Sequence, residues 1–273
     1  MSRVPTVILN NGIEMPRLGF GVWQVPDEEA PEAVATALEA GYRKIDTAAA
    51  YYNEAGTGKG IAESGIDRAE VFVTTKVWNT EHGYDSTLRA FDASLNRLGL
   101  DHVDLYLIHW PVPDKDLYVD TYRALEKIYA DGRARAIGVS NFLREHLDRL
   151  ADETSVVPAV NQIELHPQHQ QAEARALHAE RGIVTESWSP LGSGRGLLKA
   201  PVIGAIARKY DRSPAQVVLR WNLQLGNVVI PKSAYPPRIA ENVDVFGFSL
   251  DDEDMATFAA LEQGRPLGPA KKK

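Results

Sequence analysis

The sequence predicts a closed barrel of parallel strands alternating with helices, a (β/α)8 fold. Short β-rich runs alternate with longer amphipathic patterns along almost the whole chain, which favours parallel pairing through helical crossovers. About eight strands can be recognised, and 273 residues is a common length for this fold. No linker-like or low-complexity stretch divides the chain, so we expect residues 1–273 to form one domain.

The first predicted element is a β-hairpin, formed by two short runs around Asn10-Asn11-Gly12 in "TVILNNGIEMP". We expect it to cap one end of the barrel. The barrel strands follow as β-rich runs at residues 19–22, 44–46, 71–76, 103–109, 134–139, 159–162, 184–188 and 228–230. Amphipathic stretches such as "DEEAPEAVATALEAG", "DSTLRAFDASLNRLG" and "LYVDTYRALEKIYADG" predict helices between them, and several end in glycine, a frequent helix stop.

A doubly wound sheet is the rival architecture, but its dinucleotide-binding fingerprint is incomplete. Gly19-Phe20-Gly21 begins a Gly-x-Gly-x-x-Gly pattern, yet Gln24 stands at the third glycine position and no helix follows at once. The glycines of "GTGKG" (56–60) lie inside a helical stretch and not at a strand-to-helix turn. The barrel is therefore favoured.

Composition argues against several classes of protein. The net charge of −7 argues against a general nucleic-acid binder, which would carry a basic face. The chain has 0 cysteines, which excludes disulfides, thiolate metal sites and cysteine nucleophiles, and fits a reducing compartment. No secretory signal is recognisable and no apolar run approaches the ~20 residues that span a bilayer. We therefore expect a cytoplasmic protein with no membrane or nucleic-acid partner, and Lys271-Lys272-Lys273 as a solvated tail.

Polar residues stand at the predicted carboxyl ends of the strands, where barrels of this kind hold their chemistry. In chain order these are Asp46, Lys76, His109, Ser140-Asn141, Gln162 and Trp188-Ser189. Burying such groups is unfavourable unless they have partners. For any one of these residues, a structural role as a buried, hydrogen-bonded core residue is the commoner explanation. Their joint appearance on successive strands, however, favours a catalytic or binding site.

Three of these side chains, Asp46, Lys76 and His109, form a coherent chemical set with Tyr51, which follows Asp46 by five residues. A tyrosine has a pKa near ~10 and donates a proton poorly unless its phenolate is stabilised. A buried lysine would stabilise it, a carboxylate would keep the lysine charged, and the histidine could orient a carbonyl oxygen. Such a group would donate a proton to a carbonyl compound.

Two other chemistries remain open for the same residues. Lys76 could form a Schiff base, as in an aldolase barrel. Alternatively, a metal could bind to a set of carboxylates and histidines: Asp46, His109, Glu164, His166 and His169. The metal hypothesis is the weaker, because "ELHPQH" lacks a helical histidine pair and Pro167 would break a helix there.

A late stretch, "VVIPKSAYPPRIAENVDVF", predicts an anion site. Lys232, Ser233 and Arg238 converge near the start of a helix, which suits a phosphate monoester such as the 2′-phosphate of NADP. Upstream, "SPLGSGRG" offers Ser193 and a run of backbone N–H groups that could hold a pyrophosphate.

With these motifs in place, the sequence resembles the aldo-keto reductase family, and most closely its bacterial 2,5-diketo-D-gluconic acid reductases. Three ordered stretches carry the resemblance, "GYRKIDTAAAYYNEAGTG", "IGVSNF" and "IPKSAYPPRIAEN", with "LYLIHWP" and "VNQIELHP" between them. The resemblance covers essentially the whole chain. It implies NADPH-dependent reduction of small aldehydes, ketones, dicarbonyls or keto sugars by a monomer that has no Rossmann domain.

The resemblance also implies a role for each site residue. Tyr51 would be the general acid, Asp46 and Lys76 would tune it, and His109 would orient the carbonyl. The implied NADPH-binding residues are Gly21, Ser140, Asn141, Gln162, Trp188, Ser189, Leu191, Gly192, Ser193, Lys232, Ser233, Arg238, Glu241 and Asn242. Among them, Ser140, Asn141 and Gln162 would surround the nicotinamide carboxamide, and Trp188 would stack on the nicotinamide ring. Residues 191–193 would follow the pyrophosphate. The residues from Lys232 to Asn242 in this list would hold the adenosine end.

The substrate pocket is expected to be lined by Trp23, Tyr52 and Trp110. Tyr52 follows the implied general acid where the diketogluconate reductases carry glycine, and "AYPP" (234–237) replaces a segment that often holds a bulky apolar residue and an arginine. The C-terminal "GRPLGPAKKK" is short and lacks aromatic residues, which predicts an open pocket. The alternative to an enzyme is a non-catalytic barrel that binds or senses NADPH.

Overall fold

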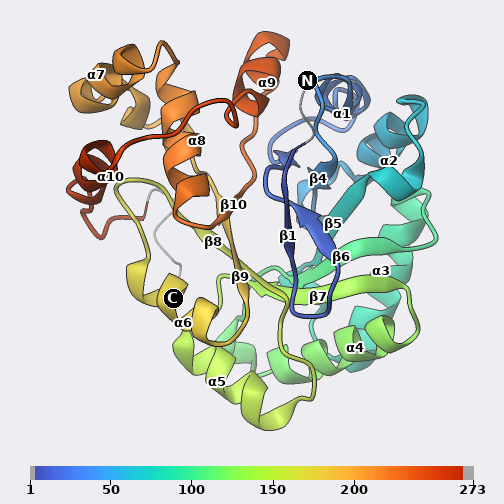
Figure 1. Cartoon of the computed structure of the whole chain (residues 1–273). Coiled ribbons are helices and arrows are strands. Elements are labelled where there is room, and N and C mark those ends of the chain that lie inside the picture. Colours follow the sequence, from blue (N-terminus) through green and yellow to red (C-terminus); the bar gives the residue numbers. More distant parts are fainter. Residues whose placement is uncertain (1–3, 267–273) are drawn as a thin grey trace.

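The computed structural model describes residues 4–266 of the chain, and its centre is a closed parallel barrel (Figure 1). Eight strands lie in the order of the sequence: β3 (Phe20–Gly21), β4 (Lys44–Asp46), β5 (Phe72–Val77), β6 (Val103–Ile108), β7 (Ala134–Ser140), β8 (Val160–Glu164), β9 (Val184–Trp188) and β10 (Val228–Val229). A parallel bridge between Leu18 and Val229, and a bond from Gly21 N to Pro231 O of 3.1 Å, join the last strand to the first. The predicted (β/α)8 barrel is confirmed, and the doubly wound sheet is excluded.

Helices surround this sheet, as Figure 1 shows. They are α1 (Ala30–Glu39), α2 (Glu54–Glu63), α3 (Tyr84–Leu98), α4 (Tyr118–Ala130), α5 (Arg144–Glu153), α6 (Ala172–Glu180), α7 (Pro201–Lys209), α8 (Pro214–Gln224), α9 (Pro236–Val243) and α10 (Asp252–Ala259). Two helices, α7 and α8, lie between β9 and β10. In the part of the chain that the structure describes, no helix is both long enough and apolar enough to cross a bilayer.

Local sequence signals explain several helix ends. Helix α3 stops at Gly99, whose φ of 65° is in the left-handed region that glycine adopts without strain. Helix α8 begins with a capping box, in which Gln216 N donates to Ser213 Oγ and Ser213 N donates to Gln216 Oε1. Pro214 occupies the first turn, where its missing N–H is not needed.

The glycines of α2 allow this helix to approach its neighbours closely. A Cβ atom on Gly58 would lie 1.9 Å from the carbonyl oxygen of Leu98, and one on Gly56 would lie 2.1 Å from that of Asp27. Neither distance is possible between real atoms, so α2 can pack in this position only with glycine at both sites. The "GTGKG" run therefore serves helix packing.

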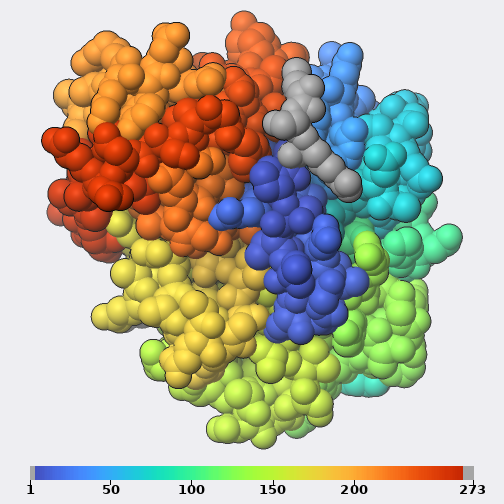
Figure 2. Space-filling view, in the orientation of Figure 1, coloured from blue at the N-terminus to red at the C-terminus, as the bar shows by residue number. Residues whose placement is uncertain are grey.

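The N-terminal hairpin of β1 (Thr6–Ile8) and β2 (Glu14–Pro16) closes one end of the barrel. Asn10 Nδ2 donates to Pro158 O, just before β8, and Asn11 Nδ2 donates to Arg135 O, at the start of β7. Both contacts are at the amino ends of strands, and Figure 2 shows the hairpin filling the centre of that face. Leu9 and Met15 pack among buried residues of the barrel interior. The expected cap is confirmed, and it leaves the carboxyl ends of the strands as the open end.

Small differences from the expected strands concern their ends. Gln162, expected to end its strand, lies in the middle of β8, because Glu164 pairs with Trp188 and extends the ladder by two residues. Strand β10 ends at Val229 and not at residue 230. The predicted tail Lys271-Lys272-Lys273 lies outside the described residues.

Candidate active site

Asp46, Tyr51, Lys76 and His109 come together at the open end of the barrel. Asp46 ends β4, and Tyr51 follows on a short 3-10 helix (Ala49–Tyr51). The Lys76 ammonium lies 2.6 Å from Asp46 Oδ1 and 5.1 Å from the centre of the Tyr51 ring. The rings of Tyr51 and His109 meet edge to face, with centroids 5.6 Å apart. The four side chains expected to act together therefore do lie together.

Lys76 is a fully buried cation with two oxygen partners. Its Nζ donates to Asp46 Oδ1 and, over 2.9 Å, to the backbone oxygen of Thr47. Burial is the largest influence and lowers the pKa of Lys76, but Asp46, Tyr51 and Glu186 together outweigh it, so the pKa is raised above the ordinary value for lysine. Lys76 is therefore an ammonium ion at neutral pH, which makes it a poor nucleophile for a Schiff base.

The phenol of Tyr51 is subject to opposing effects. Burial raises its pKa, the ammonium of Lys76 lowers it, and the negative charge of Asp46 raises it again; the net pKa is above the usual value. The influence of Lys76 has the sign that the sequence suggested, but burial dominates. Tyr51 therefore holds its proton at neutral pH, with a cation positioned to stabilise the phenolate once that proton has left.

His109 is buried and held neutral. Burial, and secondarily the charge of Lys76, lower the pKa of His109 well below the ordinary value for histidine. Its Nδ1 is buried with no hydrogen-bond partner, and Trp78 packs edge to face against its ring at 5.0 Å. A neutral imidazole can orient an oxygen through one N–H but has no extra proton to release, so Tyr51 is the better proton donor.

A second ion pair lies deeper in the barrel, and it was not predicted from the sequence. Lys44 and Glu186 are both fully buried, and Lys44 Nζ lies 3.0 Å from Glu186 Oε1. Gln162 Nε2 donates to Glu186 Oε2 and to Asp46 Oδ2, each over 2.8 Å. The strand period of two was a usable signal, because Lys44 shares a face of β4 with Asp46 and Glu186 shares a face of β9 with Trp188.

Ser140, Asn141 and Trp188 form a hydrogen-bonded group beside the four residues. Trp188 Nε1 donates to Asn141 Oδ1 over 3.0 Å, and Asn141 Nδ2 donates to the backbone oxygen of His109. Ser140 Oγ donates to the backbone oxygen of Gln162 over 2.7 Å. Asn141 has a φ of 62°, which asparagine tolerates better than most residues. The predicted nicotinamide-binding residues thus lie around His109 and Gln162.

The loop after β9 suits an anion. Ser189, Gly192, Ser193, Gly194 and Gly196 all have positive φ, and tight turns of this kind are a common source of backbone N–H groups for binding an anion. Ser193 Oγ donates to Ser189 Oγ over 2.7 Å. Leu191 is partly buried and Gly192 is buried. The loop is a suitable support for a pyrophosphate.

Two unpaired cations lie at the predicted adenosine end. Lys232 and Arg238 are exposed, and within residues 4–266 neither has a hydrogen-bond or ion-pair partner for its side chain. The Arg238 guanidinium lies 5.8 Å from the ring centre of Tyr235. Ser233 is nearly buried and accepts a bond from Tyr235 N. Free cations at the start of α9 fit the 2′-phosphate of NADP.

The other residues predicted to bind the cofactor, Glu241, Asn242 and Gly21, have contacts that stabilise the fold. Glu241 accepts a hydrogen bond from Ser213 Oγ, the N-cap of α8, and Asn242 is buried. Gly21 N bonds to Pro231 O where the barrel closes, and a Cβ there would lie 3.2 Å from Ile230 O. Gly21 pairs with Asp46 in the ladder between β3 and β4, whereas Glu241 and Asn242 have no described contact with the four catalytic candidates.

The expected pocket residues differ in exposure. Trp23 is 45% exposed, Tyr52 is 84% exposed, and Trp110 is partly buried. Tyr52 has a φ of 56° in the turn after Tyr51, and its side chain lies largely in solvent. Trp78 was not predicted, although its contact with His109 places it nearer the site than Tyr52.

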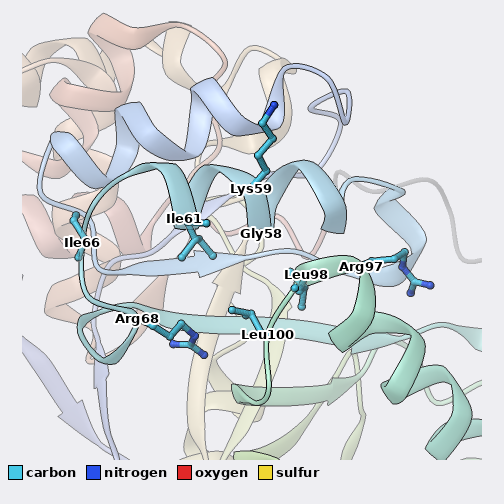
Figure 3. Close-up of a pocket in the computed structure, with 10 residues that line it drawn as sticks. Gly58, Lys59, Ile61, Ile66, Arg68, Arg97, Leu98 and Leu100 are labelled. Carbon is cyan, nitrogen blue, oxygen red and sulfur yellow. The ribbon is translucent and has the colours of Figure 1, made fainter.

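A separate hollow of about 340 Å³ lies between α2 and the segment after α3 (Figure 3). Its lining includes Ile61, Leu98 and Leu100, and Figure 3 shows Lys59, Arg68 and Arg97 pointing in different directions. Arg68 and Arg97 are already paired with Asp104 and Glu54. This hollow therefore has no convergent polar groups and lies apart from the candidate site.

Comparison with known proteins identifies the family of this chain. Residues 17–263 match the model of the aldo/keto reductase family. The chain belongs to that family. It is thus an oxidoreductase, as the sequence predicts. It is 53% identical to the glyoxal reductase of Bacillus subtilis, over 97% of this chain and 95% of the relative. It is 51% identical to the methylglyoxal reductase DkgA of Escherichia coli strain K12, over 97% of this chain and 96% of that relative.

A solved structure shows the same fold with a cofactor. A single-residue mutant of Gox0644 in complex with NADPH superposes with a TM-score of 0.92, at 50% identity, covering 96% of this chain and 94% of that one. The resemblance inferred from the sequence motifs is thereby confirmed at the level of family and fold.

Proposed function

We propose that this protein reduces small carbonyl compounds to alcohols with NADPH, and that Tyr51 donates the proton. The observation that carries the proposal is the arrangement at the open end of the barrel: a protonated Tyr51 beside the Lys76–Asp46 ion pair and a neutral His109. Names of relatives point to glyoxal and methylglyoxal as model substrates. Aldehydes, ketones, other dicarbonyls and keto sugars belong to the same chemical class.

Carbonyl reduction needs a hydride on carbon, which is the chemistry that NADPH supplies when bound, and a proton on oxygen. The neutral imidazole of His109 donates a hydrogen bond that orients the carbonyl oxygen. Tyr51 transfers its phenolic proton to that oxygen, and the phenolate left behind is stabilised by the ammonium of Lys76. Asp46 keeps this ammonium in place through the 2.6 Å contact.

The residues expected to hold the cofactor support NADPH in particular. Gln162 and Asn141 could bond a carboxamide, and the ring of Trp188 is fixed by Asn141. Lys232 and Arg238 would hold the 2′-phosphate, which NADH lacks. Tyr235, which already contacts Arg238, offers an aromatic face for the adenine.

The first experiment measures NADPH consumption against a panel of glyoxal, methylglyoxal, simple aldehydes and keto sugars, with Tyr51→Phe beside the wild type. We expect turnover of several dicarbonyls and a loss of at least about a hundredfold in the variant, because general-acid catalysis contributes roughly 10²–10⁴-fold. NADPH affinity, followed by tryptophan fluorescence, should change little.

Other outcomes would separate the alternatives. A variant as fast as the wild type would remove Tyr51 from the mechanism. Binding of NADPH by the wild type without consumption of any panel member would favour the non-catalytic sensing role. A borohydride-trapped adduct on Lys76 would favour the Schiff-base mechanism.

We also propose that the protein works as a cytoplasmic monomer and that residues 1–273 act as one domain. The absence of cysteine in the sequence suits a reducing compartment. The four catalytic candidates contact one another within a single chain, which supports a site that one subunit can form.

A further inference from the structure

A buried charged pair lies directly beneath the candidate site, and the proposed chemistry does not use it. Lys44 and Glu186 are each 0% exposed. Lys44 Nζ contacts Glu186 Oε1 at 3.0 Å and donates to Thr74 Oγ1 over 2.8 Å. Replacing a buried ion pair by apolar residues of similar size is often neutral or stabilising, so stability alone is a weak explanation for a charged pair in the barrel interior.

The pair is connected to the site through one amide group. The Nε2 of Gln162 has two hydrogens, and the structure uses both: one for Glu186 Oε2 and one for Asp46 Oδ2, each over 2.8 Å. A carboxylate accepts hydrogen bonds and cannot donate them. Gln162 is therefore held with its nitrogen between the two carboxylates, because a flipped amide would place its oxygen against two negative charges.

This constraint determines where the other end of the amide points. Within residues 4–266 no donor bonds the Oε1 of Gln162. That oxygen remains available as an acceptor beside Ser140, whose hydroxyl bonds the backbone of Gln162. An oxygen fixed in this way can accept a hydrogen bond only from a donor group such as the NH₂ of a carboxamide.

We propose that the Lys44–Glu186 pair is a positioning device, which fixes the side-chain amide of Gln162 so that its oxygen faces the carboxamide of the nicotinamide. The proposal rests on the proposed function, because it assumes that NADPH binds at this end of the barrel. Lys44 holds the carboxyl group of Glu186 in place through the 3.0 Å contact, and Glu186 with Asp46 determines the orientation of Gln162. Neither member of the pair touches the reacting atoms.

Two matched double variants test this role. Lys44→Met with Glu186→Gln removes both charges but keeps an oxygen that accepts from Gln162. Lys44→Met with Glu186→Met removes the charges and the acceptor together. The measurement is the Kd of NADPH, from quenching of tryptophan fluorescence, after circular dichroism has shown that both proteins are folded. We expect the Glu186→Met member to bind NADPH at least about tenfold more weakly than the Glu186→Gln member, since the lost bond leaves the amide free to rotate.

Equal Kd values for the two folded variants would overturn the proposal. If the Glu186→Met member does not fold, Glu186→Asp in the otherwise unchanged chain decides instead: it keeps the charge but withdraws the carboxylate by one methylene group. We expect its Kd to rise at least about threefold, and an unchanged Kd would overturn the positioning role. Failure of wild-type protein to bind NADPH would instead refute the proposed function, and this inference with it.

Discussion

At the scale of single residues, the charge states of Tyr51 and His109 predict how activity depends on pH. Burial raises the pKa of Tyr51 above the usual value and lowers that of His109 well below it. Both groups therefore keep one protonation state across the neutral range. We expect kcat/KM for methylglyoxal reduction, at saturating NADPH, to stay within about threefold between roughly pH 6 and pH 9.

Initial rates in buffers of constant ionic strength would check this expectation. A fall in rate centred near the ordinary histidine pKa of about 6.5 would show that His109 titrates in the neutral range, contrary to its burial. A fall on the alkaline side well below pH 9 would show that Lys76 lowers the pKa of Tyr51 more than burial raises it.

The chemistry of the candidate site was largely predictable from residue types at strand ends. Asp46, Lys76 and His109 were grouped on that basis, Tyr51 was added for its chemistry, and the structure brings the four together. Their catalytic roles remain predictions. The Lys44–Glu186 pair was missed because a lysine or glutamate near a strand usually faces solvent, and only the closed barrel turns both side chains inward.

At the scale of elements, the close packing of α2 predicts a difference between two helical glycines. Gly58 lies under the carbonyl of Leu98, where a Cβ would be 1.9 Å away, whereas a Cβ on Gly204 in α7 would meet nothing nearer than 3.6 Å. Gly58→Ala should therefore lower the free energy of unfolding by at least about 2 kcal/mol through overpacking. Gly204→Ala should raise it by roughly 0.5–1 kcal/mol, because alanine is the better helix former.

Urea unfolding of the two variants and the wild type measures both changes. If Gly58→Ala were as stable as Gly204→Ala, helix α2 could shift away from α3, and the close approach would not be required by the fold. The two substitutions are chemically identical, so intrinsic helix preference cancels in the comparison and only the local packing differs.

The elements themselves were predictable to different degrees. Strand runs and helical periodicity predicted the barrel, and Asn10-Asn11-Gly12 predicted the hairpin, because these signals are local. Strand β8 ends later than predicted and β10 ends one residue earlier. A strand continues as long as its neighbour offers hydrogen-bonding partners, as Trp188 does for Glu164. That information lies in the neighbouring strand and not in the segment itself.

At the scale of the whole molecule, the barrel has a sealed end and a reactive end. Leu9 and Met15 of the hairpin belong to one buried apolar cluster with Leu105 and Leu107 of β6, in the barrel interior. Beside this apolar cluster, the barrel interior contains two buried ion pairs, Lys44–Glu186 and Lys76–Asp46. Because the hairpin closes the amino end of the barrel, we expect a substrate to approach Tyr51 and His109 from the carboxyl ends of the strands, where the loops would determine which carbonyl compounds enter.

The buried histidines predict that the folded molecule is sensitive to acid. Burial lowers the pKa of His82 and of His178 to about 4. The ring of His178 accepts from Asn161 Nδ2 and so donates to Thr185 Oγ1, an arrangement that requires the neutral form. The unfolded chain binds a proton on each histidine near pH 6.5, but the folded chain does so only near pH 4. Stability is therefore fully present above pH 6.5 and is lost as the pH falls toward 4.

Urea unfolding at pH 7 and pH 5 tests this dependence. Each buried histidine should contribute about 2 kcal/mol to the loss of stability between these two pH values. His178→Gln should reduce the loss by about that amount, whatever its stability at pH 7, because glutamine does not titrate. His102→Gln, at a partly exposed histidine, offers a matched control for the substitution, and its loss is the reference for that of His178→Gln. An identical pH dependence in the wild type and in His178→Gln would mean that protonation elsewhere drives acid unfolding.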